Sequence, residues 1–352
     1  MPRGLRMAWF GAIAAAVIVV GRADEPSVGP GARFVSIGWI ARQLGMSMNP
    51  GSDRRTETIS SPAHRVRIES ESREVSFDGL RMFLGEPTVD SRAPSDPQDL
   101  CVSRVDYERR LLPLLRPQLA GSLPRQPRII AIDPGHGGSD HGTENHRLGL
   151  MEKTFTLDVG LRLRRLLERE GYKVVMTRTD DSRHAPDQVE DLQRRAEVAN
   201  LAGADLFLSI HFNSVAPDTR TRGTEVYTFP PAHQRSSASW QEHRDDSEPE
   251  FSAANRYDCW NTVFAHALHR ELVLALHTED RGEKLRHLGV LRGLNCPGAL
   301  AECAFLSNDS EAMRVATTAF RQQVAEGLDA GIRAYSAEIG LLRAEEGLRP
   351  PQ

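Results

Sequence analysis

The feature that most constrains the fold is a regular alternation of strand-like and helix-like segments that begins near residue 128. Short apolar runs, which are typical of buried strands, lie at 128–133, 173–178, 205–210, 223–229, 288–292 and 299–305. Longer stretches with apolar residues at helical spacing lie at 152–170, 187–202, 257–277 and 309–336. Such alternation is typical of an α/β sheet with covering helices. We therefore predict a mixed, largely parallel twisted sheet with helices on both faces over residues 128–338.

The region in front of this alternation has a different pattern. Residues 24–33 and 121–127 are rich in turn-forming residues, so we expect both to be linkers. Between them, residues 65–79 alternate polar and apolar side chains in the period-two manner of strands. Residues 100–117 have the pattern of a strand that leads into a helix. We predict a small α+β domain over 34–120 and see no catalytic spacing within it.

The two ends of the chain carry further signals. Residues 1–6 are positively charged, and the 14 residues "MAWFGAIAAAVIVV" that follow are apolar but short for a membrane span. We predict a signal peptide over 1–23, cleaved after Ala23, and hence export to the periplasm or cell envelope. An uncleaved anchor is the alternative. Residues 339–352 are expected to be a loose tail.

Charge and cysteine content exclude some classes of function. The formal net charge is −4, and removing the three arginines of residues 1–23 would change it to −7. A mildly acidic protein is a poor candidate for nucleic-acid binding, and no segment beyond the signal is apolar enough for membrane insertion. The four cysteines, Cys101, Cys259, Cys296 and Cys303, leave both disulfides and free thiols open, because sequence cannot choose among their possible pairings. No C-x-x-C pair exists, so a zinc knuckle is not indicated.

One histidine stands at the end of the first predicted strand, in "IIAIDPGHGG" at 129–138. His136 has glycine neighbours at positions 135, 137 and 138, so little bulk surrounds its imidazole. In open α/β sheets, ligand-binding and catalytic residues commonly lie at the carboxyl ends of strands. A metal ligand or catalytic group explains this setting better than an ordinary loop histidine does.

Three further residues are placed to meet it. His211 closes the predicted strand of "SIHFNS", and Glu302 lies in the otherwise apolar strand "GALAECAF", where an unpaired carboxylate is costly. Glu152 begins the first helix, where a role at the helix dipole is an equally good explanation. Two imidazoles and one carboxylate form a zinc-binding set with an open position, and a second carboxylate can serve as a base.

The chain resembles the zinc-dependent N-acetylmuramoyl-L-alanine amidases of the amidase_3 family over about residues 127–337. The segments that carry the resemblance are "IAIDPGHGGSDHG", "LMEKTFTLDVGLRLRRLLEREGYKVVMTRTDD", "LQRRAEVANLAGADLFLSIHFNS", "RGTEVYTF" and "EDRGEKLRHLGVLRGLNCPGALAECAFLSN". The resemblance implies zinc ligands at His136, Glu152 and His211 and a catalytic glutamate at Glu302. It implies a structural role for Arg195.

The resemblance also implies the reaction, which is cleavage of the amide bond between N-acetylmuramic acid and L-alanine in peptidoglycan. Another zinc hydrolase of wall fragments, such as a deacetylase or carboxypeptidase, and a non-catalytic wall-binding module are the alternatives. A possible activator protein is not identified by the sequence. The order of elements in 34–115 resembles the copper amine oxidase N-terminal-like domain, which suggests attachment to the wall or a partner, or packing against the catalytic domain.

Some features depart from the family or compete with the site. Cys303 stands where the family commonly has glycine, which puts the wall of the pocket in doubt. The insertion at 230–256 is expected to border the substrate groove, and a role that only caps the sheet is the alternative. His266 and His269 lie three apart on a helix, and we expect them on a solvated face. The sequence contains neither H-E-x-x-H nor G-x-S-x-G, which disfavours a zincin protease and a serine hydrolase.

Overall fold

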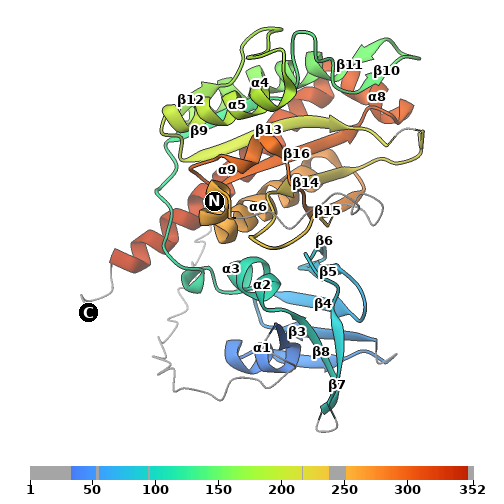
Figure 1. Ribbon diagram of the computed structural model, residues 1–352, viewed down its shortest axis with the longest axis vertical. Coiled ribbons are helices and arrows are strands. Elements are labelled where there is room, and N and C mark those ends of the chain that lie inside the picture. Colours follow the sequence, from blue (N-terminus) through green and yellow to red (C-terminus); the bar gives the residue numbers. More distant parts are fainter. Residues whose placement is uncertain (1–32, 53–54, 94–95, 216, 238–250, 348–352) are drawn as a thin grey trace, which may run out of the picture.

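The computed structural model describes residues 33–52, 55–93, 96–215, 217–237 and 251–347. The predicted signal peptide and nearly all of the first linker therefore lie outside the described residues. Among the residues that the structure describes, no helix combines the length and the apolar character needed to cross a bilayer. Two parts stand out in Figure 1, which we call the accessory unit (residues 34–120) and the α/β unit (residues 128–347).

The α/β unit is built on strands β9 (Ile129–Pro134), β12 (Lys173–Met176), β13 (Leu206–Asn213), β14 (Thr224–Thr228), β15 (Asp280–Leu285) and β16 (Gly298–Phe305). Their order in the sheet is β12-β9-β13-β16-β14-β15. All neighbours are parallel except β14 and β16, which are antiparallel. The predicted mixed, largely parallel sheet is confirmed, and its parallel strands place the carboxyl ends of β9, β13 and β16 at one edge.

Helices cover both faces of this sheet. They are α4 (Glu152–Arg169), α5 (Gln188–Leu201), α6 (Asp258–Leu276), α7 (Gly289–Arg292), α8 (Asp309–Ala316) and α9 (Thr318–Gly347). Successive side chains of a strand point to opposite faces of the sheet. The side chains of β9 therefore enter two hydrophobic cores, one on each face of the sheet. Ile130 and Ile132 pack in the same cluster as Val159 of α4, whereas Ala131 packs with Ala196 of α5.

Two predicted elements are wrong. The apolar run at 288–292 is the short helix α7 rather than a strand, and the sixth strand is the preceding β15, "DRGEKL". The sequence of β15 is mostly charged, so a search for apolar periodicity does not identify it as a strand, although Glu283 and Lys284 are buried. The last predicted helix is two helices that meet at Thr317, and α9 continues to Gly347. Ile339 and Leu342 of α9 are buried, so this part of the predicted tail is packed.

The accessory unit is α+β, as predicted. It contains β1 (Phe34–Ser36), α1 (Ile37–Leu44), β2 (Ser47–Pro50), β3 (Thr56–Ser60), β4 (Arg65–Glu69), β5 (Glu74–Phe77), β6 (Leu80–Phe83), β7 (Val89–Ala93), β8 (Asp96–Ser103), α2 (Arg104–Asp106), a π-helical turn (Tyr107–Leu111) and α3 (Leu112–Leu115). Strands β2 to β6 form an antiparallel meander, and β1, β8 and β7 form a separate sheet. Its resemblance to a copper amine oxidase domain stays a prediction.

The meander joins the sheet of the α/β unit through β6 and β15, which pair in parallel at Met82 and Glu283. The backbone N–H of Arg81 donates to Oδ2 of Asp280 at 2.8 Å. Gly282 has φ 91°, and a Cβ there would lie 2.7 Å from the Phe83 ring, so only glycine allows this close approach. The two units therefore share one eleven-stranded sheet.

The histidines of α6 lie at this junction rather than on a solvated face, so that prediction is wrong. His269 is fully buried, and Nε2 of its imidazole lies 3.1 Å from Oδ1 of Asp280. His266 Nδ1 lies 2.7 Å from Oε1 of Glu283, and its ring packs edge-on against Phe77 of the accessory unit. A sequence pattern on α6 does not reveal the accessory strands that cover this face.

Candidate metal centre

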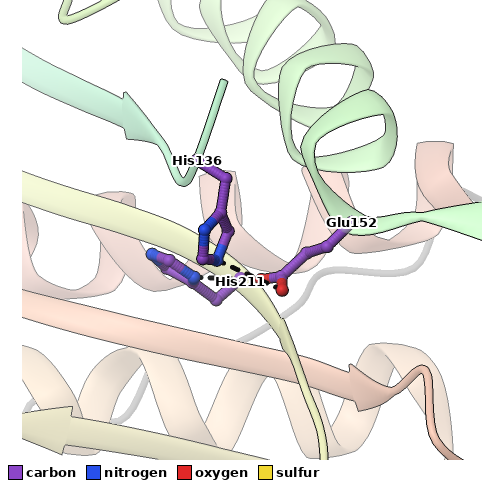
Figure 2. A group of neighbouring side chains, drawn as sticks. All are labelled: His136, Glu152 and His211. Carbon is purple, nitrogen blue, oxygen red and sulfur yellow. Dashed lines mark hydrogen bonds and ion pairs between the residues drawn. The ribbon is translucent and has the colours of Figure 1, made fainter. Parts of the chain in front are cut away.

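Three of the predicted site residues meet at the carboxyl edge of the sheet. His136 follows β9, His211 lies near the carboxyl end of β13, and Glu152 is the first residue of α4. One ligand atom from each lies within 4.8 Å of the others. Figure 2 shows both imidazoles pointing toward the Glu152 carboxylate. The topology therefore brings together residues that are up to 75 positions apart, from His136 to His211.

Glu152 is the centre of this cluster and is almost fully buried. Its Oε2 accepts the backbone N–H of Thr143 at 2.8 Å, and its Oε1 accepts that of Phe212 at 2.9 Å. The same oxygens lie 3.2 Å from His136 Nε2 and 3.0 Å from His211 Nδ1. Burial by itself would raise the pKa of Glu152, but the two imidazoles lower it below its usual value. The carboxylate is thus held in place and ionised.

His136 is oriented by Asp140, whose Oδ2 lies 2.9 Å from its Nδ1. An ionised carboxylate only accepts hydrogen bonds, so Nδ1 carries a proton and Nε2 faces Glu152. Burial lowers the pKa of His136, but Asp140 and Glu152 outweigh it and raise the pKa to about 10. The His136 imidazole lowers the pKa of Asp140 to about 2. The site therefore favours positive charge at this point, which fits a bound metal cation.

Two glycines create the space for the cluster. A Cβ at Gly135 would lie 2.2 Å from Cε1 of His211, which real structures do not tolerate. Gly142 has φ 68°, and a Cβ there would lie 2.6 Å from Cδ2 of His136 and 2.7 Å from Oε2 of Glu152. Gly135, one of the glycines that marked this region in the sequence, is therefore required by the proximity of a candidate ligand. Gly142, which sequence reasoning did not single out, is required for the same reason.

We expect Gly142→Ala to weaken metal binding by at least about tenfold, because the added methyl group displaces His136 or Glu152. Gly149→Ala is a matched control, since Gly149 lies in the same loop with φ 65° but has no atom within 4 Å of an added Cβ. Both variants carry the cost of a left-handed alanine, about 1–2 kcal/mol. Metal affinity measured by chelator competition should fall only for Gly142→Ala, and equal affinities would contradict the steric argument.

Glu302 lies beside the cluster in β16. It pairs in register with His211 on β13 and with Glu225 on β14, so these three side chains share one face of the sheet. Its Oε2 is buried and has no hydrogen-bond partner among the described residues. Burial raises the pKa of Glu302 well above its usual value, and the charges of Glu152 and Glu225 raise it further. An unpaired carboxylate beside a metal site is suited to accept and return a proton.

Cys303 does not form part of this face. Its side chain belongs to the core on the opposite side of the sheet, so replacing glycine by cysteine at this position leaves the site open. All four cysteines are buried free thiols, the alternative to disulfides that the sequence left open. A pocket of about 180 Å³ is lined by both imidazoles and also by Leu288, Gly289 and Val290.

Sequence reasoning missed two buried acids that support the site. Glu225 accepts hydrogen bonds from Asn213 and from the Tyr227 hydroxyl, the latter at 2.7 Å, and also contacts the Lys284 ammonium. Asp133 accepts a hydrogen bond from the Ser209 hydroxyl, which also contacts His211, and is paired with Arg195 at 2.8 Å. Arg195 also donates to the His136 carbonyl at 2.8 Å, in keeping with a structural role. The position of Asp133 at a strand end was the one sequence signal that could have suggested either of these two acids.

Of the insertion at 230–256, the structure describes residues 230–237 and 251–256. Ser237 donates its backbone N–H to the Leu285 carbonyl at 2.8 Å, and Gln234 Nε2 lies 3.4 Å from the Ser103 hydroxyl of the accessory unit. These residues run along β15 toward the accessory unit. None of the described residues of the insertion lines the pocket beside the imidazoles. That the insertion borders the substrate groove stays a prediction.

Comparison with known proteins gives consistent matches to one enzyme family. A family model described as N-acetylmuramoyl-L-alanine amidase (Amidase_3) matches residues 130–334. The chain is 36% identical over 200 residues to a sporulation-specific N-acetylmuramoyl-L-alanine amidase of Bacillus subtilis (strain 168). The aligned region covers 56% of this chain and 64% of that protein. The chain is 31% identical over 228 residues to a germination-specific amidase of the same strain, over 62% of this chain and 84% of that protein.

Among solved structures, the catalytic domain of CwlV, an N-acetylmuramoyl-L-alanine amidase from Bacillus (Paenibacillus) polymyxa var. colistinus, matches 59% of this chain and 97% of its own. The identity is 28% and the TM-score is 0.47. The matched region of this chain spans slightly less than two thirds of the sporulation-specific relative. The family match falls on the α/β unit, where the ligand cluster lies.

Proposed function

This chain belongs to the N-acetylmuramoyl-L-alanine amidase family (Amidase_3), and we propose that it hydrolyses the peptidoglycan amide with one zinc ion held by His136, Glu152 and His211. The observation that carries the proposal is the convergence of both imidazoles on the buried Glu152 carboxylate. Nitrogen and carboxylate oxygen donors in this number are typical of catalytic zinc sites that keep one position open. A zinc ion bound there would supply Lewis acidity, which acidifies water and polarises a carbonyl group.

Glu302 is proposed as the catalytic base and acid. Its buried, unpartnered Oε2 is free to take a proton from the attacking water and to give that proton to the departing amine. Amide nitrogen leaves poorly without a proton, so this transfer is required for turnover. Asn213, Tyr227 and Lys284 hold the neighbouring Glu225 by hydrogen bonds and charge, so it is not free to compete for the role.

The proposed scissile bond joins the lactyl carbonyl of N-acetylmuramic acid to the L-alanine of the stem peptide. Because the substrate lies outside the cytoplasmic membrane, the proposal includes export to the periplasm or cell envelope through the predicted signal at 1–23. Incubation with purified peptidoglycan tests the bond. New amino ends on L-alanine are the expected product, whereas free acetate or new carboxyl ends at D-residues would identify a deacetylase or carboxypeptidase, and no product would favour a wall-binding module.

We propose that the accessory unit stabilises the α/β unit and adds contacts to the wall. Removing it would uncover β15, where Phe83 packs on Gly282 and Arg81 binds Asp280. A chain that begins at residue 127 is expected to melt several degrees lower than the full chain and to bind purified wall less well. Phe83→Ala in the full chain should reproduce only the loss of thermal stability. Equal melting temperature and wall binding of the shortened chain would contradict the proposal.

A further inference from the structure

We propose that Asp133, acting through Ser209, fixes the tautomer of His211 and so decides which of its ring nitrogens binds the metal. The inference rests on the proposed metal site and assigns a positioning role to two residues outside the ligand set. The three side chains lie in a row on one face of the sheet, because Asp133 pairs in register with Ser209 and His211 is two residues further along β13.

The donor and acceptor of each hydrogen bond can be assigned by beginning with Asp133, whose side chain is buried at 1% exposure. Its Oδ1 receives Thr177 Oγ1 at 2.6 Å and Arg195 Nη1 at 2.8 Å. Its Oδ2 receives Ser209 Oγ at 2.6 Å. The charge of the buried Arg195 keeps the Asp133 carboxyl ionised, and an ionised carboxylate has no proton to donate. All three partners must therefore donate to it.

Ser209 has a single hydroxyl proton, and that proton is directed to Asp133. The Ser209 oxygen can then only accept from His211 Nε2, which lies 3.1 Å away. It follows that Nε2 always carries a ring proton, so Nδ1 is the nitrogen whose proton a metal ion would replace. Nδ1 is the nitrogen that lies 3.0 Å from Glu152 Oε1, at the centre of the ligand cluster.

The two imidazoles are thus supported in different ways. His136 presents Nε2 to the cluster and is oriented by the partly exposed Asp140 of its own loop. His211 presents Nδ1 and is oriented through β9 and β13, whose register is fixed by the sheet. Partners of the non-ligating ring nitrogen commonly set both the tautomer and the affinity of a metal-binding histidine. A buried carboxylate that acts through a hydroxyl is well suited to this purpose, since solvent does not compete with it.

Asp133→Asn tests the proposal with almost no change in size. The carbonyl oxygen of the substituted side chain can still accept from Thr177 and Arg195, but its amide group donates to Ser209. The Ser209 hydroxyl is then free to donate to His211 Nε2, which favours the tautomer with a proton on Nδ1. We expect zinc to bind about 10- to 100-fold more weakly, measured by competition with a chromogenic chelator at neutral pH.

Thr177→Val is the matched control, because the Thr177 hydroxyl donates to the same carboxylate at 2.6 Å but makes no hydrogen bond to His211. Its zinc dissociation constant should stay within about threefold of the wild-type value, although its stability falls. Ser209→Ala should weaken zinc binding, and Ser209→Thr, which keeps the hydroxyl, should restore it. Ser209→Ala also serves as the test if Asp133→Asn does not fold.

Nitrogen-15 NMR of the zinc-loaded wild type gives a second readout that is independent of activity. The expected spectrum has His211 bound to zinc through Nδ1 and protonated at Nε2. Binding through Nε2, or unchanged zinc affinity in both Asp133→Asn and Ser209→Ala, would overturn the inference while leaving the proposed function intact. Failure of the wild type to bind zinc would instead overturn the proposed function.

Discussion

Glu302→Gln is expected to lower the rate of amide hydrolysis by about 100- to 10,000-fold while the protein keeps its zinc. The substitution removes the proton acceptor but preserves the shape of the side chain and leaves all three proposed ligands in place. Burial and the charges of Glu152 and Glu225 raise the pKa of Glu302, so the neutral amide suits this environment and the variant should fold. Release of L-alanine amino ends from peptidoglycan measures the rate, and elemental analysis measures the metal.

Glu144→Gln is the control for this experiment. Glu144 lies in the short strand β10 (Glu144–Asn145), between His136 and Glu152 in the chain, and its carboxylate pairs with His141 at 3.0 Å, outside the ligand cluster. Its substitution should change the rate by less than a few fold. A Glu302→Gln variant with the activity of the wild type would remove Glu302 from the reaction, and one that had lost its zinc would indicate a role as a ligand instead.

His211→Ala is expected to reduce bound zinc from one equivalent to less than about a tenth of that value after dialysis against metal-free buffer. The variant loses one of the three proposed ligands and leaves the buried Glu152 with a single imidazole partner. Loss of activity should follow the loss of metal. Chelators should lower the melting temperature of the wild type but not that of the variant, because a ligand that binds only the folded state stabilises it.

His141→Ala serves as the comparison, since His141 lies in the same loop as His136 but pairs with Glu144 at the surface. It should retain one equivalent of zinc. If His211→Ala held zinc as firmly as this control does, the cluster at the edge of the sheet could not be the metal site, and the zinc-dependent mechanism would fail with it.

Local sequence patterns were enough to predict where most of the candidate site residues lie in the fold. Hydrophobic periodicity located β9, β13 and β16, and strand order in α/β proteins then assigned His136, His211 and Glu302 to one edge. The same reasoning failed for β15, because its charged residues find partners in other elements: Glu283 faces His266 and Lys284 contacts Glu225. Periodicity records the average environment of a strand and cannot identify individual buried ion pairs.

The sequence by itself determined the α/β architecture and the residue types at the strand ends, because both follow from short-range patterns of apolar side chains and glycines. Only the tertiary structure decided that both imidazoles contact Glu152 and that Ser209 connects Asp133 to His211. It also decided that β6 pairs with β15 and extends the sheet. Each of these depends on distances between segments far apart in the chain. Those distances are set by sheet register and packing, which no local stretch of sequence encodes.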